Sequence, residues 1–304
     1  MIESSTRILA KFVADLQFED IPKEVVTKIR NHILDTLGVA IFGSTTQWGR
    51  ILADAVGELS EKKEAWVWGY DLRTSCTNAA LANATFAHGF ELDDTHKDAT
   101  LHPGPLCIPP ALAVAEKVGG VSGKNFMTAV VAGYETVSRI GMSVMPSSFA
   151  RGYHPTGICG TFGAAAAASK ILQLDENKVA QALGISGSLS AGLMAAQYAA
   201  MVKRMHAGRA AESGVLSALL AKSGFTGIDN ILELKWGGFC SSFADKYDLT
   251  KITNGLGKKY ETLVVGYKPY ASAASVQTPI DAIKQIMHKH SVTHNMIEKI
   301  IVRS

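Results

Sequence analysis

The sequence predicts a mainly α protein: a large all-helical domain followed by the start of a smaller α+β lid domain. Apolar residues recur at intervals of three and four through most of the chain, which is the period of an α-helix. Only three short segments resemble strands, namely residues 65–69, 262–266 and 297–302. The last two flank a helical pattern and give a β-α-β order. We therefore predict an all-α domain over residues 1–247 and an incomplete α+β lid over residues 248–304.

The helical pattern repeats along the first domain. In chain order it covers residues 6–16, 21–44, 50–59, 74–88, 110–118, 125–144, 161–172, 177–188 and 208–222. Small residues dominate two of these regions, as in GTFGAAAAASK and HAGRAAESG. Because glycine costs about 1 kcal/mol against alanine inside a helix, its repetition predicts helix backbones in close contact.

The composition is that of a globular chain and excludes several classes of protein. Of the 304 residues, 47% are hydrophobic and 19% are charged, and the formal net charge is +3. The apolar content is too high for a disordered chain, and the charge is too small for a nucleic-acid-binding surface. The apolar stretches fall short of the ~20 residues of a membrane span, and the N-terminus lacks a signal-peptide core.

The cysteines indicate a reducing compartment. Cys76, Cys107, Cys159 and Cys240 are scattered without a CxxC pair. This spacing argues against a disulfide framework and against a structural zinc site. We expect the cytoplasm or an organelle matrix.

Titratable residues gather in four segments, of which the first is AHGFELDDTHKDATLHPG at 87–104. Its acids and histidines occupy the end of a helix and the loop that follows. A solvated loop in which Asp93 or Asp94 caps a helix explains any single acid. That explanation is weaker for the group, because His102 stands at a turn just before an apolar helix whose N-terminus can bind an anion.

The second segment, GYHPTGICGTFGAAAA, contains another His-Pro turn. Pro155 biases the backbone of His154 towards an extended conformation, and Thr156 is a suitable N-cap for the next helix. A lone histidine at such a turn usually bonds only to the backbone. Two such turns in one chain favour a shared cleft.

The third and fourth segments are basic. MVKRMHAGRAAESG places Lys203, Arg204 and His206 just before a helix, where a solvated surface turn is the simplest explanation. YKPYASAASVQTPIDA places Lys268 before a proline. Together, the four segments suit a small substrate with several carboxylates, because Lys and Arg pair with carboxylates while histidine exchanges protons near pH 7.

A metal site is the main rival interpretation. His96, Asp98 and His102 offer nitrogen and oxygen ligands, and Asp93 or Asp94 completes the set. Their spacing matches no specific zinc or iron motif, so we predict no metal. The glycine-rich segments lack the residues or the preceding strand of a nucleotide-binding loop.

In these segments the sequence resembles the MmgE/PrpD family, which includes 2-methylcitrate dehydratase, cis-aconitate decarboxylase and iminodisuccinate epimerase. The resemblance is carried by DDT and HPG within 93–104, LAVAEKVGGVSGKNFMTAVVAGYE at 112–135, HPTGICGTFGAAAAA at 154–168, the turn at 203–208 and KPY at 268–270. It implies an all-helical domain with an inserted α+β lid, a homodimer, and an active site between the domains that uses no cofactor.

The resemblance also implies most of the site residues, while Arg204 and His206 are added from the basic cluster of the third segment. The predicted catalytic residues are His154, His102, Asp93 and Lys203, and the predicted substrate-binding residues are Glu91, Thr95, Lys268, Arg204 and His206. We expect His154 to be the base and His102 the acid or a substrate contact, although these two roles can be exchanged. Lys203 and Lys268 are expected to bind carboxylates.

The leading prediction is a hydro-lyase of the 2-methylcitrate dehydratase type. Elimination of water needs a base at the carbon beside a carboxylate, positive groups on the developing enediolate and an acid for the leaving hydroxyl. Decarboxylation and epimerisation also move a proton beside a carboxylate and remain open. A metal-dependent hydrolase and an inactive relative that serves as an assembly partner are the alternatives from other classes.

The chain departs from the family at two places. Relatives often have a cysteine after KPY and a histidine before the IDA of the lid helix, whereas this chain has Ser272, Ser275 and Gln277. Glutamine carries no proton near neutral pH. Family members also continue past residue 304, so we expect the chain to be a fragment or a short form with an incomplete lid.

Overall fold

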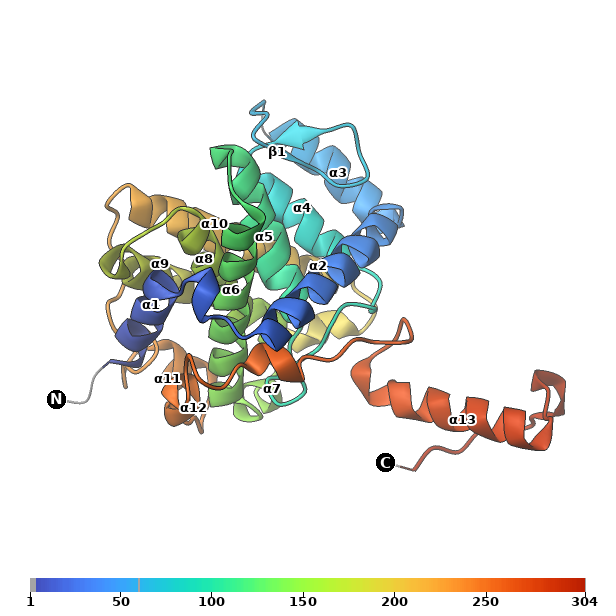
Figure 1. The fold of residues 1–304 in the computed structure, drawn as a ribbon. Helices are drawn as coiled ribbons and strands as arrows, with labels where there is room; N and C mark the ends of the chain where they lie inside the picture. The colour runs from blue at the N-terminus through green and yellow to red at the C-terminus, as the bar shows by residue number, and fades with distance from the viewer. Residues whose placement is uncertain (1–3, 60, 304) are drawn as a thin grey trace.

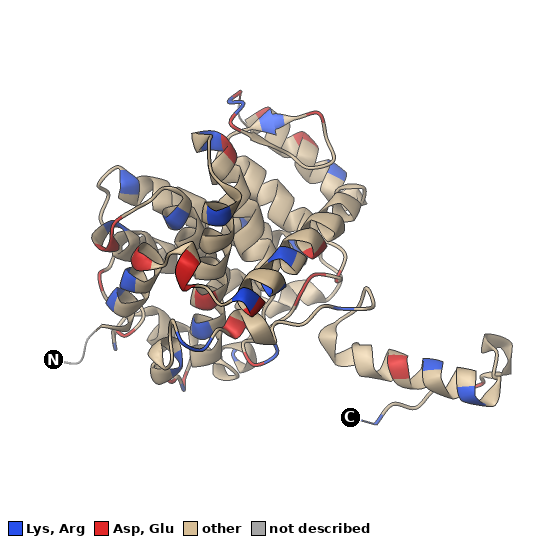
Figure 2. Ribbon diagram, viewed as in Figure 1, with Lys and Arg blue, Asp and Glu red and all other residues tan. Residues whose placement is uncertain are grey.

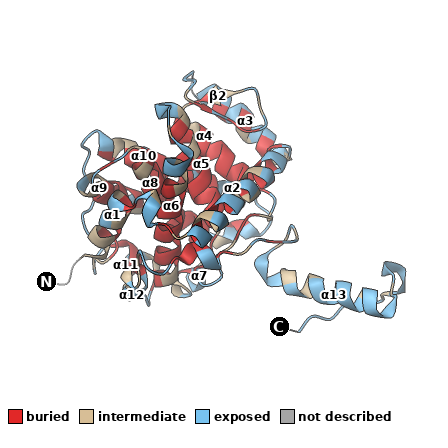
Figure 3. Ribbon diagram, in the orientation of Figure 1, coloured by how far each residue is buried: buried red, intermediate tan, exposed pale blue. Residues whose placement is uncertain are grey.

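Two long helices, α6 (Gly123–Val144) and α8 (Pro155–Ile171), lie at the centre of the molecule and are buried along most of their length. The structure is a computed structural model and describes residues 4–59 and 61–303. Helices α5 (Pro103–Val118) and α10 (Val202–Lys222) pack beside α8, and α4 (Cys76–His88) packs against both. Figures 1 and 3 show these helices surrounded by more exposed ones. The chain is mainly α-helical, as the sequence predicts.

The remaining elements surround this centre. The outer helices are α1 (Ser5–Asp15), α2 (Lys23–Ser44), α3 (Gln47–Leu59), α7 (Ser147–Ala150), α9 (Glu176–Ser188), α11 (Phe239–Phe243), α12 (Thr250–Thr253) and α13 (Gln277–His290). Short 3₁₀ helices cover Phe18–Asp20, Met194–Gln197, Glu261–Val264, Ala274–Val276 and His294–Met296. Strands β1 (Ala65–Trp66) and β2 (Arg73–Thr74) form an antiparallel pair with Ala65 opposite Thr74.

Small residues let the central helices approach closely, as their repetition predicts. A Cβ at Gly214 of α10 would lie 2.4 Å from the Cβ of Ala164 on α8. A Cβ at Gly133 of α6 would lie 2.9 Å from the carbonyl oxygen of Gly163 on α8. Both distances are shorter than real carbon contacts, so the backbones meet where no side chain fits. This contact fixes the relative positions of the helices whose ends carry the titratable segments.

Three helices begin six or seven residues earlier than the apolar pattern predicts. The structure starts α5 at Pro103, α8 at Pro155 and α10 at Val202, against predicted starts at residues 110, 161 and 208. Proline fits the first helical turn, and Gly-rich or mixed first turns carry little apolar periodicity. Two site predictions change as a result.

The earlier starts change which residues cap and which are helical. His154, and not Thr156, is the N-cap of α8, and Thr156 lies inside the helix. Lys203, Arg204 and His206 lie in the first turns of α10 and not before it. His102 is the N-cap of α5, so the predicted His-Pro turn directly before an apolar helix is confirmed.

The predicted strands are only partly present. The segment 65–69 contains β1, but residues 262–266 form most of a 3₁₀ helix and a single bridge from Gly266 to Thr95. Residues 297–302 form no strand, and all of them except the half-buried Ile297 are exposed. Apolar β-branched runs favour strands only where another strand can pair with them, and no strand lies within residues 248–303. The expected β-α-β order is therefore wrong, although its helix is present as α13; the division into two domains stays a prediction.

Helix α13 extends away from the helical body (Figure 1). None of its residues is buried (Figure 3). Basic and acidic residues are interspersed over the face of the body seen in Figure 2. Within the described residues, no helix has the length and apolar character needed to cross a membrane.

A buried ion pair on α6 holds the segment that leads to Lys268. The Arg139 guanidinium lies 3.2 Å from a Glu135 oxygen and donates to the carbonyl oxygens of Asn254 at 2.9 Å and Lys259 at 2.6 Å. Glu135 accepts bonds from the Thr262 amide at 2.9 Å and its hydroxyl at 2.8 Å. Both charged side chains are almost fully buried, so these bonds replace their hydration.

Breaking this pair is expected to destabilise the fold. Arg139→Met leaves the Glu135 charge without its cation and removes three bonds to backbone carbonyls, those of Ile252, Asn254 and Lys259. We expect the free energy of unfolding to fall by about 3–5 kcal/mol. Urea denaturation measures the change. The matched control is Arg209→Met, whose side chain is 56% exposed beside Glu212; it should cost less than about 1 kcal/mol. Equal losses in the two variants would contradict a structural role for Arg139.

Candidate active site

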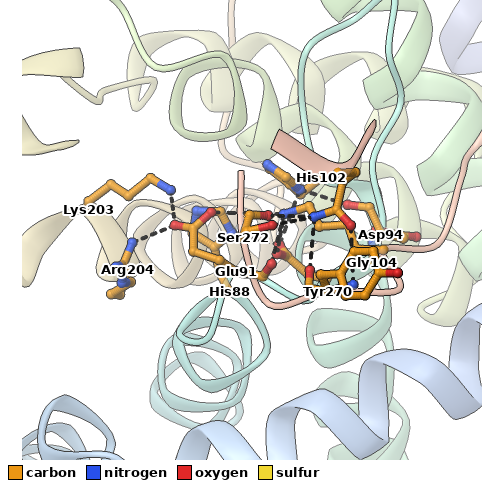
Figure 4. Close-up of polar contacts among 12 residues, drawn as sticks. His88, Glu91, Asp94, His102, Gly104, Lys203, Arg204, Tyr270 and Ser272 are labelled. Atoms are coloured by element: carbon orange, nitrogen blue, oxygen red, sulfur yellow. Dashed lines mark hydrogen bonds and ion pairs between the residues drawn. The ribbon is translucent and has the colours of Figure 1, made fainter. Parts of the chain in front are cut away.

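The four titratable segments meet at one place, where three helices begin and one ends. His88 lies in the last turn of α4, His102 and His154 cap α5 and α8, and the first turns of α10 bring Lys203 and Arg204. Figure 4 shows Lys203 and Arg204 on one side of Glu91, with His102 and Asp94 on the other. The cluster predicted from the sequence is therefore assembled in space.

Asp93 is the central acid of the site. Its carboxylate is fully buried and lies 2.7 Å from Nδ1 of His88, 3.4 Å from Nδ1 of His102 and 3.5 Å from Nζ of Lys268. Burial alone would raise the pKa of this carboxyl, but the adjacent His102, His88 and Lys268 outweigh burial and hold it well below its usual range. Asp93 is therefore an anion that orients two imidazoles and one ammonium.

Asp94 faces away from this centre and supports the scaffold. One of its oxygens accepts a bond from the Gly104 amide at 2.8 Å, in the first turn of α5. The other accepts a bond from the Tyr134 hydroxyl at 2.7 Å and lies 3.0 Å from Nδ1 of His32. The predicted helix cap is confirmed for Asp94, but the predicted solvated loop is wrong at this point, because the side chains of both Asp93 and Asp94 are fully buried.

The protonation of His102 follows from its contacts. Its Nδ1 lies 2.7 Å from the carbonyl oxygen of Asp94, which can only accept, so Nδ1 carries the hydrogen. The other nitrogen, Nε2, is then free to accept a proton. Burial lowers the pKa of His102 to about 4, although the adjacent Asp93 acts in the opposite direction. The ring is therefore neutral at pH 7.

His154 pairs with His206. Their Nδ1 atoms are 2.9 Å apart, so one ring donates and the other accepts. Burial, followed by the nearby His88 and His206, lowers the pKa of His154 far below its usual value, and burial also lowers the pKa of His206. The sequence predicts that His206 binds substrate. In the structure its Nδ1 bonds to His154 and restrains that ring, and the substrate contact stays a prediction.

Glu91 sits among three cations. Its Oε1 accepts bonds from Lys203 and, at 2.6 Å, from Arg204, while Lys268 lies 3.9 Å from Oε2. Burial would raise the pKa of this carboxyl, but His88 and Lys203 lower it. Glu91 is thus an ionised side chain that neutralises positive charge in the site.

Thr95 links the site loop to the C-terminal segment. Its amide donates to the carbonyl oxygen of Gly266 at 2.9 Å, and the Gly266 amide donates back at 2.8 Å. This bridge places Lys268 two residues later beside Asp93. The backbone of Thr95 therefore positions a substrate-binding candidate, while its predicted substrate contact stays a prediction.

Gln277 has a structural function in the loop that follows Lys268. Its side-chain amide donates to the Tyr270 carbonyl at 2.9 Å and to the Ser272 hydroxyl at 2.7 Å, and its oxygen accepts from the Tyr270 amide at 3.2 Å. These bonds close the turn between the lysine and α13. Glutamine thereby fixes the turn's shape at a position where a histidine would offer a titratable ring.

His88 is the functional candidate that the sequence did not single out. Its Nδ1 donates to the Asp93 carboxylate, and its Nε2 is buried without a hydrogen-bond partner among residues 4–59 and 61–303. The ring centroid lies 5.0 Å from that of His102 and 5.7 Å from that of His154. The available signal was a histidine in the last helical turn of the first charged segment, which resembles an ordinary C-terminal helix residue.

The predicted metal ligands do not come together. His96 lies 3.3 Å from Glu261, and Asp98 is exposed. In the described part of the chain, His88, Asp93 and His102 form a group whose ligand atoms lie within 4.8 Å of one another. Nδ1 of His88 bonds to Asp93 and Nδ1 of His102 bonds to the Asp94 carbonyl, which leaves only the two Nε2 atoms as nitrogen ligands. The Lys268 ammonium lies 3.5 Å from Asp93, where a second cation would be repelled. These residues fit a metal poorly.

Comparisons with known proteins match the chain to a family model and to several curated relatives. The MmgE/PrpD N-terminal domain model matches residues 7–251. The chain is 32% identical over 298 residues to a cis-aconitate decarboxylase-like protein of Aspergillus oryzae, covering 94% of this chain and 62% of that protein. It is 30% identical over 296 residues to cis-aconitate decarboxylase of Aspergillus terreus, covering 94% and 60%. Human cis-aconitate decarboxylase is 32% identical over 253 residues, covering 81% and 52%. The chain thus spans less than two thirds of these proteins.

The buried histidines predict a loss of stability in mild acid. The pKa of His102 and that of His154 are lowered in the folded chain, whereas an unfolded histidine titrates near 6.5. The unfolded state therefore binds more protons below pH 6.5, and each such histidine removes up to about 1.4 kcal/mol per pH unit as the pH falls.

The test is urea denaturation of the wild type and His154→Asn at pH 7.5, 6.5 and 5.5. We expect a shallower decline for the variant. His290→Asn is the control, because His290 is exposed on α13 and should leave the decline unchanged. Identical declines in the wild type and His154→Asn would contradict a depressed pKa for His154.

Proposed function

Because the chain belongs to the MmgE/PrpD family, we propose that its site binds a small di- or tricarboxylate and moves a proton at a carbon beside a carboxylate. One observation carries the proposal: Lys203, Arg204 and Lys268 meet three closely spaced imidazoles around the buried Asp93 carboxylate. Cations hold carboxylates, and imidazoles transfer protons near neutral pH. The reaction class is that of a lyase.

Decarboxylation of a cis-aconitate-like substrate is the first candidate reaction. The relatives named above support it, since their names state this activity. In this reaction the bond between carbon and the leaving carboxylate breaks, CO₂ departs, and the electron pair spreads onto the remaining substrate. Lys203 and Lys268 stabilise that negative charge, and an imidazolium returns a proton to carbon.

The proton for this step can be taken up when the substrate binds. The pKa of His154 is lowered by burial and by adjacent positive groups. Two or three substrate carboxylates beside the ring favour the imidazolium and move its pKa back upward. His154 would then protonate the carbon, while His102 contacts the substrate through its free Nε2.

Dehydration of the 2-methylcitrate type is the second candidate. It is favoured by the lowered pKa of both His102 and His154, since a neutral imidazole at pH 7 is ready to accept a proton from carbon. The electron pair left on carbon is stabilised by the lysines, and hydroxide leaves as water with a proton that the second imidazole has taken up when the substrate bound. Epimerisation uses the same base without loss of a group.

Proton NMR in deuterated water separates these reactions. Cis-aconitate, 2-methylcitrate and an aspartate-derived imine are the three substrates to compare, with CO₂ release measured in parallel. Metal analysis of the same sample tests the cofactor-free prediction, and stoichiometric zinc, iron or manganese would overturn it. Absence of turnover with ligand binding intact would favour the assembly-partner alternative.

His154→Asn tests the role of the predicted base. We expect turnover, or deuterium exchange at carbon, to fall at least about 100-fold because general acid–base catalysis contributes this much. Binding of citrate, measured by calorimetry, should change little because the three cations remain. His290→Asn is the control and should keep full activity. Near wild-type exchange in His154→Asn would reassign the base to His102 or His88.

A homodimer in a reducing compartment is the second part of the proposal. Ile51 on α3 is 54% exposed, and Met201 and Val202 beside Lys203 are 46% and 43% exposed. These side chains line one apolar groove of about 260 Å³ between α3 and the start of α10. Its apolar character favours burial against a second copy, and the four buried free cysteines suit the cytoplasm or an organelle matrix.

Light scattering tests the dimer. The wild type should have twice the mass of one chain, and Ile51→Glu should lower it to a single chain because an interface charge loses its hydration. Glu58→Gln, at an exposed position of the same helix, is the control. A monomeric wild type at micromolar concentration would contradict this assembly.

A further inference from the structure

The cations expected to bind substrate are already engaged by a carboxylate of the chain. Lys203 and Arg204 both donate to Oε1 of Glu91, the second at 2.6 Å (Figure 4). Lys268 lies 3.9 Å from Oε2 of the same group. Any substrate carboxylate that pairs with Lys203 and Arg204 must therefore share them with Glu91 or take its place.

The backbone of Glu91 adopts a conformation that residues with a side chain disfavour. Its φ is +57°, in the left-handed region, which costs a residue with a side chain roughly 1–2 kcal/mol. The Lys268 ammonium donates to the Glu91 carbonyl at 3.2 Å and contributes to holding this backbone conformation. Strained residues of this kind cluster at binding sites, where the surrounding contacts maintain them.

The charges of the site favour competition. Three cations, Lys203, Arg204 and Lys268, face two anions, Glu91 and Asp93, which leaves one surplus positive charge. If a dicarboxylate bound while Glu91 stayed ionised in place, the net charge of the site would become negative. Asp93 is fully buried between His88, His102 and Lys268, whereas the Glu91 side chain is 20% exposed and can turn towards solvent.

We propose that the Glu91 carboxylate competes with a substrate carboxylate for Lys203 and Arg204 and so limits the affinity of the site. The proposal rests on the proposed function, because it concerns the same polycarboxylate site. The opposing role is that Glu91 holds the two cations in the geometry that a substrate needs. The two roles predict opposite effects of removing its charge.

Glu91→Gln separates them. If Glu91 competes, the amide binds Lys203 and Arg204 less strongly, and the Kd for citrate and for cis-aconitate should fall at least about tenfold, the lower end of the coupling between close charge pairs. Calorimetry at fixed pH and ionic strength measures it. Glu91→Ala also removes the charge and cannot form the new hydrogen bonds that a glutamine amide can form. The Kd should therefore fall in this variant as well.

Glu212→Gln is the matched control. Glu212 lies on α10 and pairs with Arg209 at 2.6 Å, outside the site, so its substitution changes the net charge equally. Its Kd should equal that of the wild type. Circular dichroism and thermal unfolding of each variant establish that the fold is kept.

The outcomes distinguish this inference from the function on which it rests. Tighter binding in both Glu91 variants supports competition. Equal or weaker binding, with a wild type that does bind citrate, overturns competition and leaves the proposed function standing. If neither the wild type nor any variant binds either probe at millimolar concentration, the polycarboxylate site itself is wrong, and the competition fails with it.

Discussion

The burial of the Asp93 carboxylate is the constraint on which the rest of the site depends. An ionised group without hydration is stable only if charged or polar donors surround it. Asp93 obtains them from the end of α4, the start of α5 and the segment after the last 3₁₀ helix of the body, as His88, His102 and Lys268. Its charge therefore joins parts of the chain that are up to 180 residues apart, counted from His88 to Lys268.

Asp93, Asp94 and Thr95 follow one another in the chain and make three different sets of contacts. Asp93 faces the imidazoles, Asp94 turns to the scaffold and bonds to Gly104 and Tyr134, and Thr95 pairs through its backbone with Gly266. The Asp94 carbonyl also fixes the hydrogen of His102 on Nδ1. The loop thus sets the position of an acid, the start of a helix and the tautomer of an imidazole at once, so changes at one of these residues act on all three.

How much could be predicted from the sequence depends on whether the signal was local. Amphipathic helices and His-Pro turns are local, and they were predicted, as was the grouping of Lys203 and Lys268 with the histidines. The starts of α5 and α10 were missed because their first turns lack apolar periodicity. The strand predicted for residues 262–266 is absent because a strand needs a partner to pair with, and the local sequence does not show whether a partner is present. The bond between Glu135 and the Thr262 amide joins residues far apart in the chain, so the sequence near Glu135 does not indicate it. His88 meets Asp93 only five residues later, but their contact depends on the conformation of the loop after α4, which the sequence does not show.

Burial and charge act on the histidines and on Glu91 through one electrostatic potential. Burial and the cations keep the pKa of His154 low, and the same cations hold Glu91 ionised. If the site binds a polycarboxylate as proposed, the added negative charge lowers that potential, which favours protonation of the imidazoles and weakens the attraction between the cations and Glu91. Substrate binding is then coupled to proton uptake, so the ring that accepts a proton before binding becomes the ring that can donate one afterwards. Under the proposed function, a single pair of imidazoles therefore supports both base chemistry and acid chemistry on the same polycarboxylate.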